Sequence, residues 1–284
     1  MRSSVETTID LRSADAHTVR CEIRAGRYVR HTAGLAGDRL QCNLAIMPEA
    51  YALDFLRFCQ RNPKPCPLVG VSETGDPMLR TLGRDIDVRS DVPRYQVYRD
   101  GEPAEELFDI SGLWRDDMVA FALGCSFTFE RALAAGGIPM RHIEQDTTVP
   151  MYRTSIDCVP AGLFSGKMVV SMRPIRTEEI ERAARICTRF PLAHGAPVHV
   201  ARPEEIGVAD VASPDWGDPV RIEAGEVPVF WACGVTPQSA LVNARLPLCI
   251  THAPGHMLIT DIDDTAEVPV LQYQPKQDKW ESTT

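Results

Sequence analysis

Two segments of the sequence share a pattern that would place cysteine thiols at equivalent structural positions. VAFALGCSFTFERAL and VPVFWACGVTPQSAL both read V-x5-C-x2-T-x3-A-L, with Cys125 and Cys233 at the matching position. Each cysteine stands where an apolar run stops and a helix is expected to start. Ligands bind at such strand ends in open α/β sheets, and helix N-termini stabilise anions and thiolates. The pattern predicts paired thiols around an anionic substrate; the alternative is a coincidence between two buried segments.

The residues that follow the two cysteines are candidates for binding substrate. We expect backbone N–H groups near Ser126 and Gly234 to receive a developing oxyanion, and we place Thr236 in the same binding set. Cys125 and Cys233 would then act as nucleophile or proton carrier.

A histidine pair follows in the segment THAPGH. His252 and His256 flank a Pro-Gly turn, so both could face one cavity at a strand end. Histidine titrates near neutral pH, which suits general acid–base catalysis. Two alternatives remain open: loop histidines bonded to backbone, or ligation of a divalent metal with a nearby carboxylate. The catalytic role is our prediction, and we predict no metal site and no cofactor.

Two arginines stand at junctions between irregular segments and strands. Arg153 lies in PMYRT and Arg173 in SMRP, and either could hold a substrate carboxylate through two hydrogen bonds. The alternative for each is a surface salt bridge. Glu130 and His142, which follow the first cysteine segment, are secondary candidates.

Composition and missing motifs narrow the class of protein. The 284 residues include 39 acidic and 30 basic side chains, a net charge of -9, which argues against binding nucleic acid or an anionic membrane. Apolar runs are too short for a membrane span, and the N-terminus has no apolar signal-peptide core, so we expect a cytoplasmic protein. Dinucleotide and P-loop glycine motifs, GxSxG and HExxH are absent. The nine cysteines form no CxxC pairs, so we expect reduced thiols.

Strand and helix signals alternate along the chain. The patterns predict helices over 13–25, 48–62, 127–136, 177–190 and 238–246, and strands over 68–71, 94–101, 166–175, 198–200, 219–222, 226–234, 246–253 and 256–262. Residues 117–124 fit a buried strand or a helix equally well. This alternation is typical of the α/β class, and we expect a mixed sheet with flanking helices.

The domain organisation follows from the same reading. We expect one α/β domain over residues 1–268, or two intertwined α/β subdomains related by the internal pseudo-repeat, and a polar tail over 269–284. A homodimer is the expected assembly, because it is the commonest symmetric one.

Taken together, several segments resemble those of the putative hydro-lyase family, also known as the D-glutamate cyclase-like family. They are RFCQRNPKPCPLVGV, DVPRYQVYRDG, GCSFTFE, VPMYRT, VVSMRPI, FPLAHGAPVHV, GEVPVFWACGVTP and CITHAPGHMLITDI. The resemblance extends from about Arg27 to Asp263. It implies a two-part α/β fold without a nucleotide site and loss of water from a small carboxylate, with conversion of D-glutamate to 5-oxo-D-proline as the first choice.

Two other functions remain open beside this lyase. Thiols on both sides of an α-carbon would suit a racemase or epimerase. A non-catalytic protein that binds a carboxylate, or an accessory protein of pyroglutamate metabolism, is the alternative outside the enzymes. All of these have a small-molecule carboxylate as partner, and none involves nucleic acid or membrane.

Overall fold

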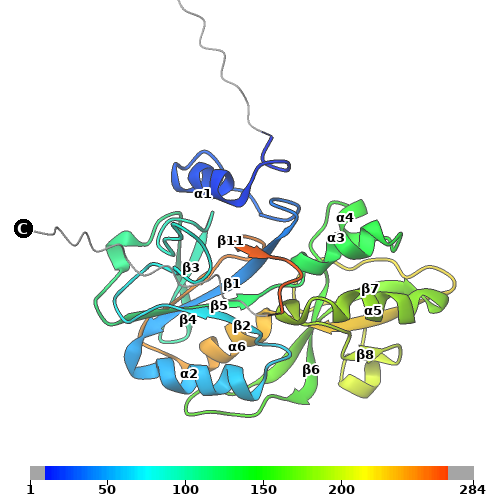
Figure 1. Ribbon diagram of the computed structural model, residues 1–284. Coiled ribbons are helices and arrows are strands. Elements are labelled where there is room, and N and C mark those ends of the chain that lie inside the picture. The colour runs from blue at the N-terminus through cyan, green and yellow to red at the C-terminus, as the bar shows by residue number, and fades with distance from the viewer. Residues whose placement is uncertain (1–9, 268–284) are drawn as a thin grey trace, which may run out of the picture.

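The computed structural model describes residues 10–267, which form two β-sheets with helices packed between and beneath them (Figure 1). The predicted tail over 269–284 lies outside the described residues. No helix in the described part of the chain is long and apolar enough to cross a membrane.

Seven strands form the larger sheet, in the order β2-β5-β1-β10-β3-β4, with β11 also pairing with β1. Their bounds are β1 (Arg39–Pro48), β2 (Leu68–Val71), β3 (Tyr95–Arg99), β4 (Glu102–Leu107), β5 (Met118–Gly124), β10 (Cys249–His252) and β11 (Leu258–Asp263). β1 is central because it pairs with β5 along one edge and with β10 and β11 along the other. Its long apolar sequence fits this place, since both faces of the strand are buried.

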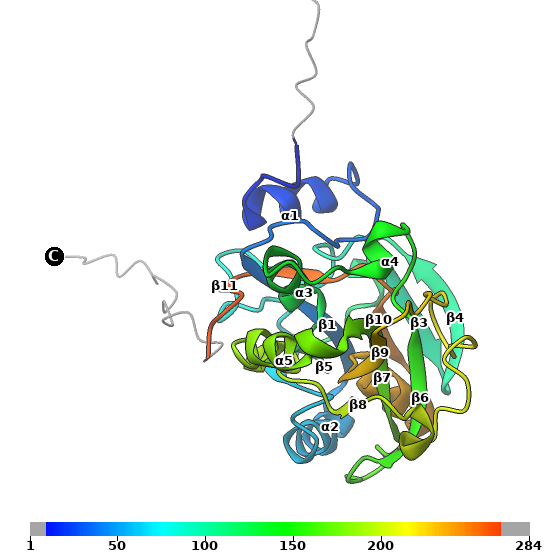
Figure 2. The ribbon, with the colours of Figure 1, turned by 90° about the vertical axis from the view of Figure 1, so that its right-hand side faces the viewer.

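The smaller sheet has four strands in the order β6-β7-β9-β8 and stands beside the larger one (Figure 2). Its strands are β6 (Met151–Asp157), β7 (Lys167–Arg176), β8 (His199–Val200) and β9 (Glu226–Ala232). One face of β7 and β9 turns towards the main core, and the other packs on a separate apolar cluster with Ile206 and Val208.

Six α-helices complete the described chain. They are α1 (Ala16–Arg24), α2 (Glu49–Arg61), α3 (Phe127–Ala135), α4 (Arg141–Glu144), α5 (Ile180–Thr188) and α6 (Val235–Ala244). α2 and α6 cover one face of the larger sheet through Phe55, Phe58 and Leu241. α3 and α5 pack in the core that joins the two sheets, where Phe129 of α3 meets Trp231 of β9 with ring centroids 5.8 Å apart.

The prediction of a mixed sheet is wrong, because every strand pairing in the described residues is antiparallel. The α/β class itself holds. A strand–helix–strand sequence gives parallel neighbours only when both strands join the same sheet. Here α3 and α4 lead from β5 in the larger sheet to β6 in the smaller one, and α6 leads from β9 back to β10.

Most predicted elements are present, but several differ or were not predicted. Residues 117–124, which periodicity left undecided, form strand β5. The predicted strand over 219–222 is wrong; this segment is irregular, and its apolar residues Val220 and Ile222 pack on the outer face of the smaller sheet. The sequence patterns did not predict β1, β4, β6 or the short helix α4. The six residues of β4, for example, are almost all exposed and therefore carry no apolar alternation.

Candidate functional site

The two cysteine segments make the same hydrogen bonds to their neighbouring strands. The Cys125 N–H donates to the Gln41 carbonyl at 3.1 Å, and the Gln41 N–H donates to Thr128 Oγ1 at 3.3 Å. The Cys233 N–H donates to the Val169 carbonyl at 3.0 Å, and the Val169 N–H donates to Thr236 Oγ1 at 2.9 Å. The shared C-x2-T spacing therefore has one structural cause: the backbone of a neighbouring strand residue is clamped by the cysteine and the threonine.

Both strand–helix junctions contact one side chain, that of Asn43 in β1. Its Nδ2 donates to the carbonyl of Gly124, the last residue of β5, at 2.9 Å. A Cβ placed on Gly234, which precedes α6, would lie 2.2 Å from the same Nδ2. Since Cys125 follows Gly124 and Cys233 precedes Gly234, the structure brings the two thiols into one neighbourhood, although they are 108 positions apart in the numbering, 233 against 125.

Both thiols lie at helix N-termini and are buried, with a small exposed fraction. Cys125 is 8% exposed and Cys233 7%, whereas Cys42 beside them is fully buried. Burial raises the pKa of Cys125 to about 12, although the Phe127 N–H partly opposes the shift. Burial also raises the pKa of Cys233 against the N–H groups of Val235 and Gly234. Near neutral pH both groups are therefore thiols that can donate a proton.

Four backbone N–H groups stand at these helix starts, and three of them contact the thiols: that of Phe127 contacts Cys125, and those of Gly234 and Val235 contact Cys233. Among the described residues, no oxygen accepts from the amides of Ser126, Phe127, Gly234 or Val235. The first amides of an α-helix have no partner inside the helix and carry its positive dipole end. Two such helix ends at one place can bind a carboxylate.

A buried ion pair lies directly behind the first junction. The fully buried Arg173 guanidinium bonds to Glu130 of α3, and each of its three nitrogens donates, with Ser171 Oγ at 3.0 Å and Ser126 Oγ at 3.2 Å as further acceptors. His142 Nε2 lies 3.2 Å from Glu130 Oε1. Burial alone would raise the pKa of Glu130, but the charge of Arg173 and the contact with His142 lower it to about 2.

Two aromatic rings also pack against the guanidinium of Arg173. Its guanidinium lies 5.3 Å from the ring centroid of Phe129 and 5.4 Å from that of Trp231. Cation–π contacts of this kind strengthen when water is excluded. The side chain is thus held from all sides at the boundary between α3 and the smaller sheet.

Arg153 has a different environment from Arg173. It is exposed on β6 and stacks on the Trp216 ring at 5.4 Å. It lies on the same strand face as Met151, whose Sδ is 3.5 Å from Cys233 Sγ. Arg153 therefore stands at the rim of the second junction with its charge available to a ligand.

The two predicted histidines lie in different surroundings. His252 is buried, and its Nδ1 accepts the Leu44 N–H at 3.1 Å. Its Nε2 lies 3.2 Å from Gln238, one helical turn beyond Gly234 in α6. His256 is half-buried, with its ring Nδ1 2.8 Å from the Pro254 carbonyl. In the described residues no contact joins His256 to either cysteine.

Sequence reading missed Asn43 altogether. The available signal was a polar residue in the middle of the apolar run 40–47, on a strand with both faces buried. Such a residue needs a hydrogen-bond partner, and here Gly124 supplies it.

The close contact between Asn43 and Gly234 gives a testable coupling. We expect Gly234→Ala to destabilise the fold by about 1–3 kcal/mol, because the new methyl group overlaps the Asn43 amide. Adding Asn43→Ala should recover part of that loss. Urea unfolding of the two single variants and the double variant measures the coupling. Additive losses would show that the two junctions do not touch.

His252 should make stability depend on pH. Burial lowers its pKa from 6.5 to about 4. The unfolded chain therefore binds a proton that the folded chain refuses between pH 6.5 and 4, and stability falls as pH falls through this window. We expect His252→Asn, which keeps an acceptor for the Leu44 N–H, to remove up to about 1.4 kcal/mol per pH unit from that slope. Urea unfolding between pH 7 and 4.5 tests this; parallel curves would contradict it.

The fold and the site together define an α/β chain in which two helix N-termini and two thiols converge. A family model described as D-glutamate cyclase matches residues 119–261, a span that contains both junctions. A relative named "Putative hydro-lyase" from Jannaschia sp. is 62% identical over 260 residues, covering 92% of this chain and 98% of the relative. Relatives with hydro-lyase names from Dinoroseobacter shibae (64% identical, 90% and 85% covered) and Bordetella petrii (60% identical, 88% and 95% covered) agree.

The chain therefore belongs to the hydro-lyase family that carries the D-glutamate cyclase domain. A solved nitrogen repressor-like protein from Methanococcus jannaschii aligns over 83% of this chain and 91% of its own, with a TM-score of 0.37 and 10% identity. That similarity is too low to indicate a shared fold.

Proposed function

We propose that this protein is a hydro-lyase that closes D-glutamate to 5-oxo-D-proline with loss of water. The observation that carries the proposal is the convergence of two thiols and two helix N-termini at Asn43. The family membership supports it, since the matching family model bears the cyclase description.

The amides at the two helix starts, which bond no protein oxygen among the described residues, supply a place for the substrate's carboxylates. In the proposal, the N–H groups at the starts of α3 and α6 bind the carboxylate that reacts, where they also stabilise the oxyanion formed during attack. The exposed guanidinium of Arg153 at the rim takes the second carboxylate. A dicarboxylic amino acid fits this arrangement better than a monocarboxylic one.

The reaction forms one C–N bond and breaks one C–O bond. The amine nitrogen attacks the side-chain carboxyl carbon, and one carboxyl oxygen leaves as water with two protons that the ammonium group gives up. One thiol, that of Cys125 or Cys233, delivers a proton to the leaving oxygen. The other thiol, once deprotonated, or His252 receives a proton from the amine.

Arg173 is better suited to positioning than to binding substrate directly. Its three nitrogens already donate to protein oxygens. By holding Ser126 and Glu130 it fixes the first turn of α3, and hence the amides that would face the substrate.

The paired thiols favour a second candidate, racemisation of a small amino acid. A thiolate on one side of an α-carbon would remove its proton, and a thiol on the other would return one. Racemisation, unlike cyclisation, breaks no C–O bond.

One experiment separates the two reactions. The purified protein is incubated with D-glutamate, then L-glutamate, in D2O, with and without a divalent metal, and followed by proton NMR. Signals of 5-oxoproline are expected for D-glutamate. Loss of the α-proton signal without cyclisation would replace the cyclase by the racemase. No change with either substrate, in a folded sample, would rule out both reactions on glutamate and leave carboxylate binding to be tested by thermal stabilisation.

A further inference from the structure

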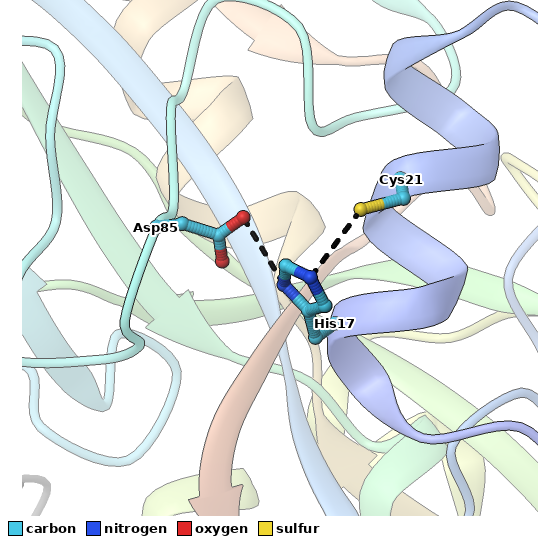
Figure 3. Close-up of side chains that lie close together, drawn as sticks. All are labelled: His17, Cys21 and Asp85. Atoms are coloured by element: carbon cyan, nitrogen blue, oxygen red, sulfur yellow. Dashed lines mark hydrogen bonds and ion pairs between the residues drawn. The ribbon is translucent and has the colours of Figure 1, made fainter.

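A second group of reactive side chains lies on α1, outside the junctions. His17 and Cys21 are one helical turn apart, and Asp85 approaches them from the segment before β3 (Figure 3). His17 Nδ1 lies 3.2 Å from Asp85 Oδ2, and Nε2 of the same ring lies 3.6 Å from Cys21 Sγ. The histidine ring thus connects a carboxylate to a thiol.

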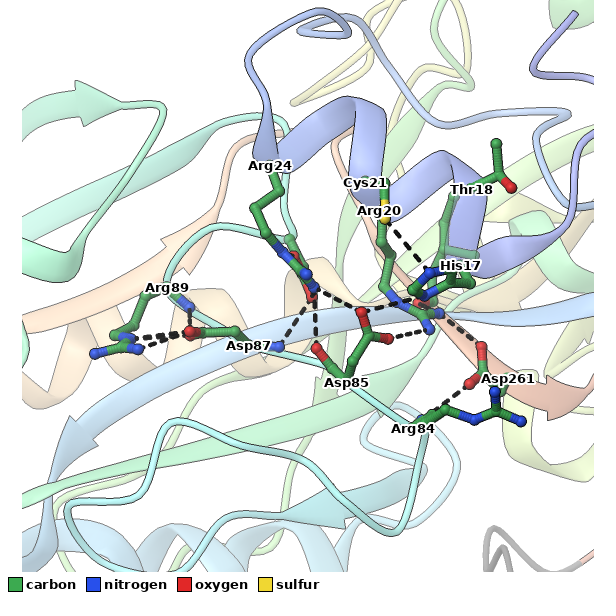
Figure 4. Close-up of polar contacts among 12 residues, drawn as sticks. His17, Thr18, Arg20, Cys21, Arg24, Arg84, Asp85, Asp87, Arg89 and Asp261 are labelled. Atoms are coloured by element: carbon green, nitrogen blue, oxygen red, sulfur yellow. Dashed lines mark hydrogen bonds and ion pairs between the residues drawn. The ribbon is translucent and has the colours of Figure 1, made fainter. Parts of the chain in front are cut away.

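Asp85 is held in place by two arginines of the same helix. Arg20 Nη2 donates to Oδ1 at 2.9 Å, and Arg24 Nη2 donates to Oδ2 at 3.2 Å (Figure 4). Arg20 is fully buried and is itself fixed by Asp261 at 2.7 Å. Burial alone would raise the pKa of Asp85, but Arg20 and His17 lower it to about 2, so the carboxylate stays charged. A fixed carboxylate that accepts the Nδ1–H leaves the Nε2 lone pair directed at the thiol.

The same three residues could also be considered as metal ligands, since their ligand atoms lie within 4.8 Å of one another. Two features favour the proton relay. The thiol and the carboxylate contact opposite nitrogens of the ring, whereas one ion can bind only one of them. The Asp85 charge is also already balanced by Arg20 and Arg24, which weakens its attraction for a cation.

The thiol is accessible to small molecules. Within residues 10–267, Cys21 is the only cysteine that is not buried. His17, though not Cys21 itself, also lines a cavity of about 350 Å³. It is lined by Asp15, Ala16, His17, Arg39, Arg84 and Asp261. Arg39 and Arg84 give it donors for a carboxylate.

We propose that Cys21 is a nucleophilic thiol that exchanges with small disulfides bearing carboxylates. His17 takes the thiol proton, and the Cys21 sulfur attacks one sulfur of the disulfide. The old S–S bond breaks as the new one forms, and the leaving thiolate takes the proton from His17. The disulfide is the only oxidant, and the product is a mixed disulfide on Cys21.

The test uses dithiobis(nitrobenzoate), a disulfide with two carboxylates, on the whole folded protein at neutral pH. We expect one fast adduct, which peptide mass mapping places on Cys21 and which Cys21→Ser abolishes. His17→Gln should slow the adduct by about tenfold or more, because the general base is lost. His31→Gln, which removes another exposed histidine, and Cys158→Ser, which removes a slightly exposed cysteine, should not change the rate.

Three results would overturn the proposal. An equal rate in His17→Gln, with its thermal unfolding unchanged, would show that the thiol is merely exposed. A first adduct on another cysteine would show that Cys21 is not the reactive thiol. Stoichiometric Zn²⁺ binding that blocks the adduct and is lost in both His17→Gln and Cys21→Ser would make the group a metal site.

Discussion

Replacing Cys233 by serine is expected to lower turnover of D-glutamate by about 10²- to 10⁴-fold while the protein stays folded. A serine hydroxyl fills nearly the same space but cannot carry a proton in the way a thiol can. The side chain lies at the start of α6, where backbone N–H groups can bond a hydroxyl as well as a thiol, so the stability cost should be small. Cys125→Ser at the start of α3 should behave in the same way. Initial rates of 5-oxoproline formation, with circular dichroism as the folding check, measure both.

Cys158→Ser is the matched control for these variants. Cys158 is 5% exposed, close to the 8% and 7% of the two junction cysteines, but it packs against the α2 side of the larger sheet. Its removal should leave turnover unchanged. If Cys233→Ser unfolds the protein, or keeps full turnover, the thiol belongs to the core and the catalytic assignment fails.

Glu130→Gln is expected to destabilise the protein by about 3–5 kcal/mol, the usual cost of leaving one member of a buried ion pair without its partner. Arg173 is fully buried, so its charge would lose the carboxylate without gaining water. Turnover should fall as well, since Arg173, which holds Ser126, would lose the carboxylate that fixes its guanidinium. Urea unfolding and initial rates measure the two effects separately.

A double variant distinguishes stability from positioning. Glu130→Leu with Arg173→Met removes both charges and replaces them with apolar groups of similar size. We expect it to lose much less stability than the sum of the single variants, because no charge remains unpaired. Turnover should stay low, since Arg173→Met removes the hydrogen bond to Ser126. A double variant with normal turnover would show that the ion pair only stabilises the fold.

The sequence could predict the junctions because their signals are local. An apolar run followed by Cys and then Thr three residues later fixes one strand end, one helix start and one clamp on a neighbouring strand. The pattern does not say which strand is clamped. In the structure it is Gln41 of β1 in one segment and Val169 of β7 in the other.

The features that the sequence could not predict depend on long-range pairing. Alternating strands and helices look the same whether a helix returns to its own sheet or crosses to another, so the mixed sheet was the wrong choice. The bond from Asn43 to Gly124 likewise joins residues from separate strands. The sequence suggests that Arg173 binds a substrate carboxylate. Only the packing in the structure shows that Phe129 and Trp231 enclose its guanidinium.

The central claim is that the two strand–helix junctions form one binding site for a small carboxylate. An NMR titration of ¹⁵N-labelled protein with the product 5-oxo-D-proline tests it most directly, because the signals of the site's own backbone amides shift when a ligand binds. The largest shifts are expected at Ser126, Phe127, Gly234 and Val235, on both helix starts together. Shifts at only one junction, or around His17 beside the other cavity, would contradict the claim.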